Sequence, residues 1–159
     1  MLNSIYRPGK ELDELISSLK SQNRKIVFTN GVFDIIHRGH VEYLNEAKRL
    51  GDVLIVGLNS DSSVKKIKGD SRPVNSENDR AFVLVNLKAV DYVVIFEEDT
   101  PYTLIKSIVP DVLVKGGDWK TEDIVGSDIV LDSGGKVLSL KFIKNYSTTG
   151  IINKISETK

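Results

Sequence analysis

The chain has 159 residues, of which 40% are hydrophobic, and its 22 basic and 22 acidic side chains balance. This size suits one domain with its own core, and the balanced charge favours neither nucleic acid nor an anionic membrane as a partner. The absence of cysteine excludes disulfides, thiolate nucleophiles and cysteine-ligated zinc, and it fits the cytoplasm. The N-terminus lacks the apolar core of a signal peptide, and no stretch approaches a membrane span. We therefore expect a single cytoplasmic domain over residues 1–159.

The hydrophobic pattern alternates along the chain between a helical period and short apolar runs. It predicts helices over 10–22, 39–51, 76–90, 100–109, 126–135 and 147–155. It predicts strands over 25–30, 52–59, 91–96, 111–116 and 136–142, with longer loops at 66–75 and 116–125. Because strands that are apolar throughout are covered on both faces, we expect an α/β three-layer sandwich with a five-stranded, mainly parallel sheet. Ligands of such folds bind beyond the carboxyl ends of the strands.

Both histidines of the chain lie in the segment FDIIHRGHVEYL, where the first predicted strand gives way to a helix. Their spacing puts His37 and His40 on one face of a helix start, and Gly39 lets a ligand approach the backbone closely. Helix N-termini attract anions, and imidazoles can donate hydrogen bonds to phosphoryl oxygens as charge builds in a transition state. The pattern therefore favours a phosphate site. The alternatives are two structural histidines near a turn, or a metal site that would need Asp or Glu as a further ligand.

The segment TNGVFDIIHRGHVEYLNEAKRLG resembles the signature G-x-F-D-x-x-H-x-G-H of the nucleotidyltransferase superfamily. The resemblance extends over nearly the whole chain. It implies a Rossmann-like sheet and transfer of a nucleotidyl group from ATP or CTP to a phosphate or carboxylate. It also implies that Asp34 holds the hydroxyls of the acceptor or helps to place a metal. The residues expected to line the nucleotide cleft are Thr29, Asn30, Gly31, Phe33 and Gly39.

Basic residues gather in the segment VKKIKGDSRPVN, residues 64–75. By composition alone this is a solvated basic turn. The string K-G-x-x-R-P-V-N, however, is similar to a loop of heptose-phosphate adenylyltransferases. That resemblance implies that Lys68 acts in catalysis and that Arg72 binds the acceptor, both by neutralising phosphate charge.

Glycines follow a lysine at the end of a predicted strand in the segment VLVKGGDW, residues 112–119. An ordinary β-turn would give the same pattern. In the resembling family the matching lysine and glycine lie at the nucleotide site, which implies a catalytic Lys115 and a nucleotide-binding Gly116. The same resemblance places Asp118 near the acceptor.

Three hydroxyl residues, Ser147, Thr148 and Thr149, open the last predicted helix. Hydroxyls there can cap the helix and can also bind phosphate. The S-T-T string resembles the second signature of the superfamily, I-S-T-T, which contacts the triphosphate. Tyr146 stands in place of the isoleucine, and no arginine lies five residues before Ser147, which weakens the branch that uses CTP and glycerol phosphate.

Two further residues have open alternatives at this stage. Arg80 lies early in its helix, where it either reaches the triphosphate or is a surface arginine. Asn59 lies at a strand end, where its amide either reads the nucleotide or belongs to a plain turn.

Taken together, the resemblance implies transfer of AMP from ATP to D-glycero-D-manno-heptose 1-phosphate by direct in-line attack, with release of pyrophosphate. Mg²⁺ would be bound mainly through phosphates, with no metal ligand assigned to the protein. The alternatives are a glycerol- or ethanolamine-phosphate cytidylyltransferase and a non-catalytic nucleotide-binding regulator. We further expect a homodimer, and a separate sugar kinase in the same pathway.

Overall fold

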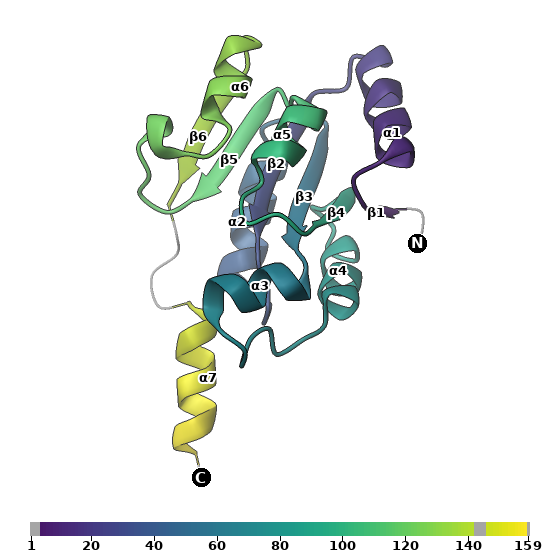
Figure 1. Cartoon of the computed structure of the whole chain (residues 1–159). Coiled ribbons are helices and arrows are strands. Elements are labelled where there is room, and N and C mark those ends of the chain that lie inside the picture. The colour runs from purple at the N-terminus through teal and green to yellow at the C-terminus, as the bar shows by residue number, and fades with distance from the viewer. Residues whose placement is uncertain (1–3, 142–145, 159) are drawn as a thin grey trace.

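The computed structural model describes residues 4–141 and 146–158 and contains a six-stranded sheet in which every described pairing is parallel. The strand order is β1-β4-β3-β2-β5-β6 (Figure 1). The strands are β1 Ile5–Tyr6, β2 Ile26–Gly31, β3 Val53–Asn59, β4 Tyr92–Phe96, β5 Val112–Gly116 and β6 Lys136–Leu140. The helices are α1 Lys10–Ser21, α2 Arg38–Lys48, α3 Asp61–Lys68, α4 Glu77–Val85, α5 Tyr102–Ile108, α6 Ser127–Asp132 and α7 Thr148–Glu157, with a 3₁₀ turn over Thr121–Asp123.

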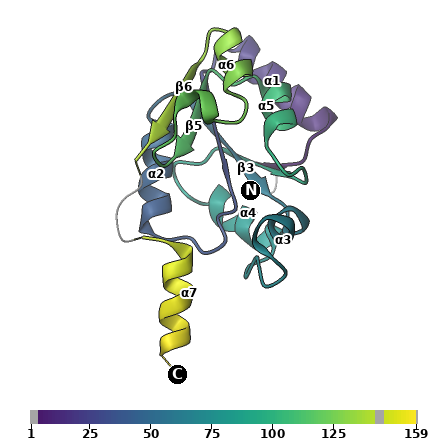
Figure 2. The same cartoon turned by 60° about the vertical axis from the view of Figure 1, so that its left-hand side comes forward.

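Helices cover both faces of the sheet, as the continuous apolar strands predicted (Figures 1 and 2). Alternate side chains of β2 enter different cores, because successive residues of a strand point to opposite faces. Ile26 and Phe28 pack with apolar residues of α1, α5 and α6. Val27 packs with apolar residues of α2 and α4. The three-layer α/β prediction is confirmed.

The order in which the chain adds strands to the sheet reverses at β2. From β2 the chain adds β3 and then β4 on one side, and it later returns to the other side of β2 with β5 and β6. The carboxyl ends of β2 and β5 therefore lie next to each other at a topological switch point. In open parallel sheets this is where ligands bind.

The structure corrects the sequence prediction in two elements. The sheet has six strands rather than five, because the two-residue β1 pairs with the edge of β4 and is too short to show a period. The helix α3 lies where we predicted a turn and a loop. It is capped by the Ser60 hydroxyl, which accepts from the Ser63 N–H, but Val64 is its one buried apolar side chain among the described residues, so its pattern is weak.

Two predicted elements end earlier than expected. The helix α4 ends at Val85, and β6 ends at Leu140, while position 142 of the predicted strand lies outside the described residues.

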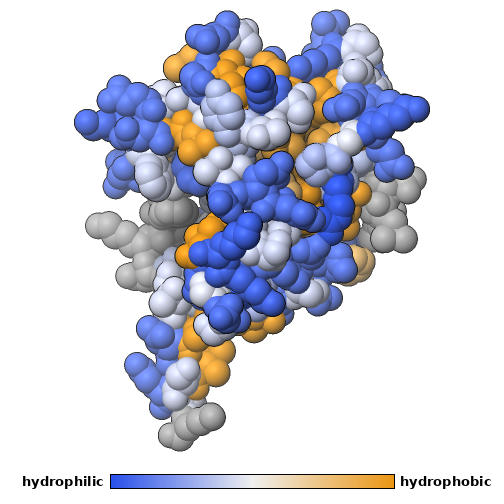
Figure 3. All heavy atoms as spheres, viewed as in Figure 1, coloured by the Kyte–Doolittle hydropathy of each residue, from blue (hydrophilic) through white to orange (hydrophobic). Residues whose placement is uncertain are grey.

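The helix α7 extends away from the sheet (Figures 1 and 2). Its start is joined to the segment after β2 by a hydrogen bond from the Thr148 hydroxyl to the Ile35 carbonyl, at 3.3 Å. It has no buried residue, and apolar side chains show on its surface in Figure 3. Within residues 4–141 and 146–158, none of the helices combines the length and the hydropathy that crossing a membrane requires.

Candidate functional site

A cavity of about 400 Å³ lies beyond the carboxyl end of β2. Three parts of the chain that are distant in sequence form it: the segment from β2 into α2, the segment from α3 towards α4, and the start of α7. Its lining residues are Val32, Phe33, Asp34, His37, Gly39, His40, Lys68, Arg72, Tyr146, Ser147, Thr148 and Thr149. The structure thus brings together the histidine pair, two of the cations of the basic segment (Lys68 and Arg72) and all three hydroxyl residues, which the sequence had singled out separately.

The two imidazole rings form the centre of this cavity. They stack with centroids 3.8 Å apart and planes at 16°, and the Phe33 ring lies 5.2 Å from that of His40. The Nδ1 atoms of both histidines are buried and have no hydrogen-bond partner among the described residues. Gly39 makes the arrangement possible, because a Cβ there would lie 3.1 Å from the ring of His37 and 3.0 Å from the Cβ of Tyr146.

Burial keeps both rings neutral near pH 7. It lowers the pKa of His40 to about 4, and the neighbouring His37 adds to the effect. Burial also lowers the pKa of His37. A neutral imidazole carries one N–H donor and one acceptor nitrogen. The pair can therefore donate hydrogen bonds to phosphate oxygens, and bound negative charge would favour its protonation.

Two helix N-termini open towards the same cavity. His37 is the N-cap of α2 and forms no side-chain cap, while Ser147 caps α7 by accepting from the Gly150 N–H at 3.0 Å. The N-terminal end of a helix carries partial positive charge and free N–H groups. With the cationic side chains of Lys68 and Arg72 on the same cavity, this arrangement suits phosphate groups.

Asp34 joins the segment after β2 to residues 72–75, which lie between α3 and α4. Its carboxylate accepts from Arg72 Nε at 2.7 Å, from the Val74 N–H at 2.8 Å and from the Asn75 N–H at 3.0 Å, and its side chain is 1% exposed. Burial alone would raise the pKa of Asp34, but the N–H groups of Asn75 and Val74 and the Arg72 guanidinium hold it below its ordinary value. Both oxygens of this carboxylate therefore bond to the protein and brace the segment before α4. The sequence had suggested instead that Asp34 binds the hydroxyls of the acceptor or helps to place a metal.

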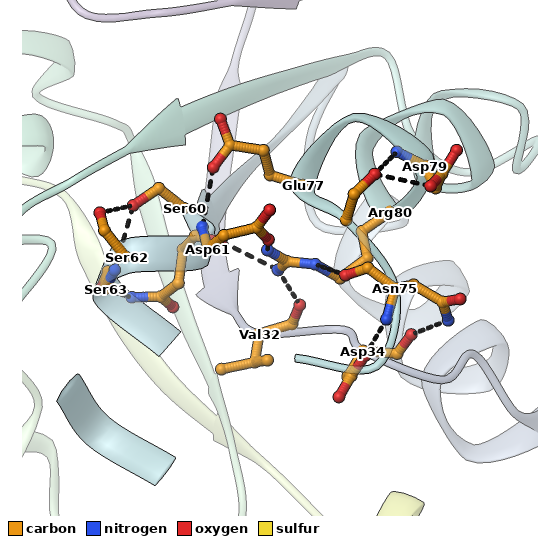
Figure 4. Close-up of polar contacts among 12 residues, drawn as sticks. Val32, Asp34, Ser60, Asp61, Ser62, Ser63, Asn75, Glu77, Asp79 and Arg80 are labelled. Carbon is orange, nitrogen blue, oxygen red and sulfur yellow. Dashed lines mark hydrogen bonds and ion pairs between the residues drawn. The ribbon is translucent and has the colours of Figure 1, made fainter. Parts of the chain in front are cut away.

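Arg80 does not line this cavity, and its guanidinium lies among Val32, Asp61 and Asn75 (Figure 4). Its Nη1 donates to the carbonyls of Val32 at 2.7 Å and Asn59 at 2.9 Å, and its Nε to that of Asn75 at 3.0 Å. Its Nη2 forms an ion pair with Asp61 at 2.8 Å. With an exposure of 1%, Arg80 is not the surface arginine that the sequence offered as one alternative, and its triphosphate contact stays a prediction. It joins the ends of β2 and β3 to α3 and the segment before α4.

Several other predicted nucleotide contacts have internal partners. The Thr29 hydroxyl is buried against the Tyr43 hydroxyl at 2.6 Å, and the Asn59 amide donates to the Ser63 hydroxyl at 2.9 Å. Gly31 lies under the Phe33 ring, where a Cβ would come within 2.9 Å of it. These residues shape the end of β2 and β3 but do not line the cavity.

Lys115 lies in a different place from the histidine pair. It lines a second cavity of about 140 Å³, together with Asn30, Pro101, Trp119, Asp123, Ile124 and Val125. Burial lowers the pKa of the Lys115 ammonium. Gly116 is buried beside this cavity at the end of β5, and Asp118 is exposed and lines neither cavity.

Sequence reasoning missed seven of the residues that line these cavities. They are Val32 and Tyr146 in the first cavity, and Pro101, Trp119, Asp123, Ile124 and Val125 in the second. Two of them carried a signal in the sequence: Tyr146 departs from the superfamily signature, and Trp119 is the single tryptophan of the chain. Among residues 4–141 and 146–158, no group of three or more His, Asp or Glu side chains is placed to hold a metal ion.

The fold and the stacked histidines at its switch point define a nucleotidyltransferase domain. The cytidylyltransferase-like family model matches residues 28–154, and the chain belongs to that family. The chain is 54% identical over 157 residues to the bifunctional protein HldE of Aliarcobacter butzleri, and 51% identical over 158 residues to that of Helicobacter pylori. These matches cover 99% of this chain but 32% and 33% of the relatives, so the chain spans about a third of their length.

Two solved structures share the fold. The lipopolysaccharide core biosynthesis protein of Thermoplasma volcanium matches with a TM-score of 0.60 and 30% identity, over 78% of this chain and 99% of its own. The pantoate-β-alanine ligase of Francisella tularensis, in complex with β-γ ATP and β-alanine, matches with a TM-score of 0.61 over 96% of this chain and 78% of its own. The ligase is 18% identical and supports the fold alone.

Proposed function

We propose that this domain transfers AMP from ATP to D-glycero-D-manno-heptose 1-phosphate and releases pyrophosphate. The observation that carries the proposal is the cavity in which two neutral, stacked imidazoles with unsatisfied Nδ1 atoms lie beside Lys68 and Arg72. The extensive identity to the HldE proteins supports it. The choice of a heptose phosphate rests on the resemblance of the segment from Lys68 to Asn75 to adenylyltransferases that use this acceptor.

The proposed reaction is a single in-line displacement at the α-phosphorus of ATP. An oxygen of the sugar phosphate attacks, the bond between the α-phosphorus and the bridging oxygen breaks, and pyrophosphate leaves. The attacking phosphate is already ionised near pH 7, so little general-base catalysis is needed. Catalysis then rests on positioning and on stabilising charge in the transition state.

The residues of the cavity have separate parts in this proposal. His37 and His40 donate hydrogen bonds to the α-phosphate and the bridging oxygen as negative charge builds. Lys68 neutralises phosphate charge, and the hydroxyls of Ser147 and Thr149 with the start of α7 bind the triphosphate. Mg²⁺, held mainly by phosphate oxygens, would supply further charge neutralisation.

A panel that combines two nucleotides with three acceptors tests this proposal. ATP and CTP would each be combined with heptose 1-phosphate, glycerol 3-phosphate and ethanolamine phosphate, and pyrophosphate release would be measured. We expect turnover with ATP and heptose 1-phosphate. Turnover confined to CTP and a smaller acceptor would contradict the proposal in favour of a cytidylyltransferase. ATP binding without pyrophosphate release in any combination would identify a regulator instead.

The wider setting of this activity also stays a prediction. We propose a cytoplasmic homodimer that receives its sugar phosphate from a sugar kinase. Size-exclusion chromatography with light scattering tests the dimer.

A further inference from the structure

The second cavity lies on the opposite side of the end of β2 from the histidine pair. Asn30 and Lys115 have the same strand phase as Phe28 and Leu113, which pack in the core beneath α1, α5 and α6. Phe33, by contrast, packs in the core on the α2 and α4 side. The carboxyl end of β2 therefore separates the two cavities, at the switch point where ligands of this fold bind.

Trp119 presents a fixed aromatic surface to this cavity. Its indole Nε1 donates to the Gly116 carbonyl at 3.0 Å, and its backbone N–H donates to the Ser139 hydroxyl at 3.1 Å. The side chain is still 49% exposed. Because the indole N–H is already bonded, what the residue offers a ligand is the face of its ring. That face carries the negative side of the aromatic quadrupole, which attracts the weakly positive C–H groups of a sugar ring.

Three polar side chains converge on the same cavity without internal partners. The Asn30 amide, the Lys115 ammonium and the Asp123 carboxylate form no side-chain hydrogen bond or ion pair with any residue that the structure describes. Lys115 is partly buried, and an adjacent anion would stabilise its charged form. Amide and carboxylate oxygens accept hydrogen bonds from hydroxyls, and an ammonium binds phosphate. A rigid aromatic face, hydroxyl-binding groups and one cation together match a phosphorylated sugar.

We infer that the Trp119 cavity is the acceptor subsite: the sugar ring lies against Trp119, its hydroxyls bond to Asn30 and Asp123, and its phosphate pairs with Lys115. This inference rests on the proposed function and deepens it, because it assigns Lys115 to the sugar phosphate rather than to the nucleotide. The attacking phosphate would then reach the α-phosphorus from the β5 side of the end of β2. In-line displacement requires the attacking and leaving oxygens on opposite sides of the phosphorus, and two cavities separated in this way provide that.

Intrinsic fluorescence tests the inference directly, since Trp119 is the single tryptophan of the chain. Heptose 1-phosphate without nucleotide should change the emission in a saturable way, whereas a non-hydrolysable ATP analogue alone should leave it nearly unchanged. Calorimetric binding of heptose 1-phosphate with unchanged emission would overturn the subsite. Absence of both calorimetric binding and turnover would overturn the proposed function itself.

Kinetics of two Trp119 variants provide the second test. Trp119→Leu should raise the KM for heptose 1-phosphate about fivefold, because an aromatic contact contributes on the order of 1 kcal/mol, and should leave the KM for ATP unchanged. Trp119→Phe should restore most of the affinity. Phe82→Leu, on the exposed side of α4, is the control for loss of a surface aromatic and should behave as wild type. Wild-type KM for the sugar phosphate in Trp119→Leu, or an equal rise in the KM for ATP, would overturn the inference.

Discussion

The imidazoles of His37 and His40 lie face to face, with ring centroids 3.8 Å apart and planes at 16°. Two protonated rings at this distance would repel each other, and burial already disfavours their charged forms. The pair is therefore neutral without ligand. It becomes easier to protonate when phosphate charge lies beside it, as a group that stabilises a developing negative charge requires.

The same burial predicts how stability depends on pH. The pKa of His40 is about 4 in the folded protein against 6.5 when unperturbed, so the unfolded chain binds more protons between these values. The free energy of unfolding should fall by roughly 2 kcal/mol between pH 7.5 and pH 5, as measured by urea unfolding. The lowered pKa values of Asp34 and Glu77 affect stability only at more acidic pH. His40→Gln should remove most of this slope, and an unchanged slope in that variant would contradict the assignment.

Asp34→Asn tests the brace between the segment after β2 and the segment before α4. The asparagine would lack the charge that pairs with Arg72. Its NH₂ group, itself a donor, would face the N–H donors that now bond to the carboxylate. We expect a loss of about 1–3 kcal/mol in unfolding free energy and a lower kcat. Glu42→Gln is the matched control, because its ion pair with Arg38 is exposed and should contribute less than about 0.5 kcal/mol. Equal stability of the two variants would show that Asp34 is not a brace.

Arg80→Met separates a structural arginine from a nucleotide contact. The substitution leaves the Asp61 carboxylate and the carbonyls of Val32, Asn59 and Asn75 without their donor, so we expect a loss of about 3 kcal/mol in thermal or urea unfolding. Arg24→Met, at an exposed arginine, should have little effect. A selective rise in the KM for ATP at unchanged stability would instead support the predicted triphosphate contact.

The pattern of the sequence predicted the layers and most elements, because buried strands and amphipathic helices have distinct periods. It could not predict β1, whose two residues carry no period, or α3, whose stability depends on the Ser60 cap and the ion pair between Asp61 and Arg80. These features depend on neighbours that are distant in sequence.

The candidate site was predicted unevenly for a similar reason. The motif around His37 and the hydroxyls after Tyr146 are local strings, and the fold brings them to one cavity. Whether a side chain faces a ligand or another part of the protein depends on tertiary contacts. Asp34 and Arg80 look like ligand contacts in sequence, yet their hydrogen bonds are internal. Lys115 lies away from the histidines because its position in β5 points its side chain to the opposite face of the sheet, and a sequence motif does not encode that direction.

The most direct test of the central claim is the rate at which the α-phosphate label of ATP appears in a nucleotide sugar, compared between wild type and His37→Ala or His40→Ala. Loss of either imidazole should lower this rate by about 10²-fold or more, comparable to removing an oxyanion donor, with the circular dichroism spectrum unchanged. A wild-type rate in either variant, with the fold intact, would contradict the claim that the stacked histidines form the transfer site.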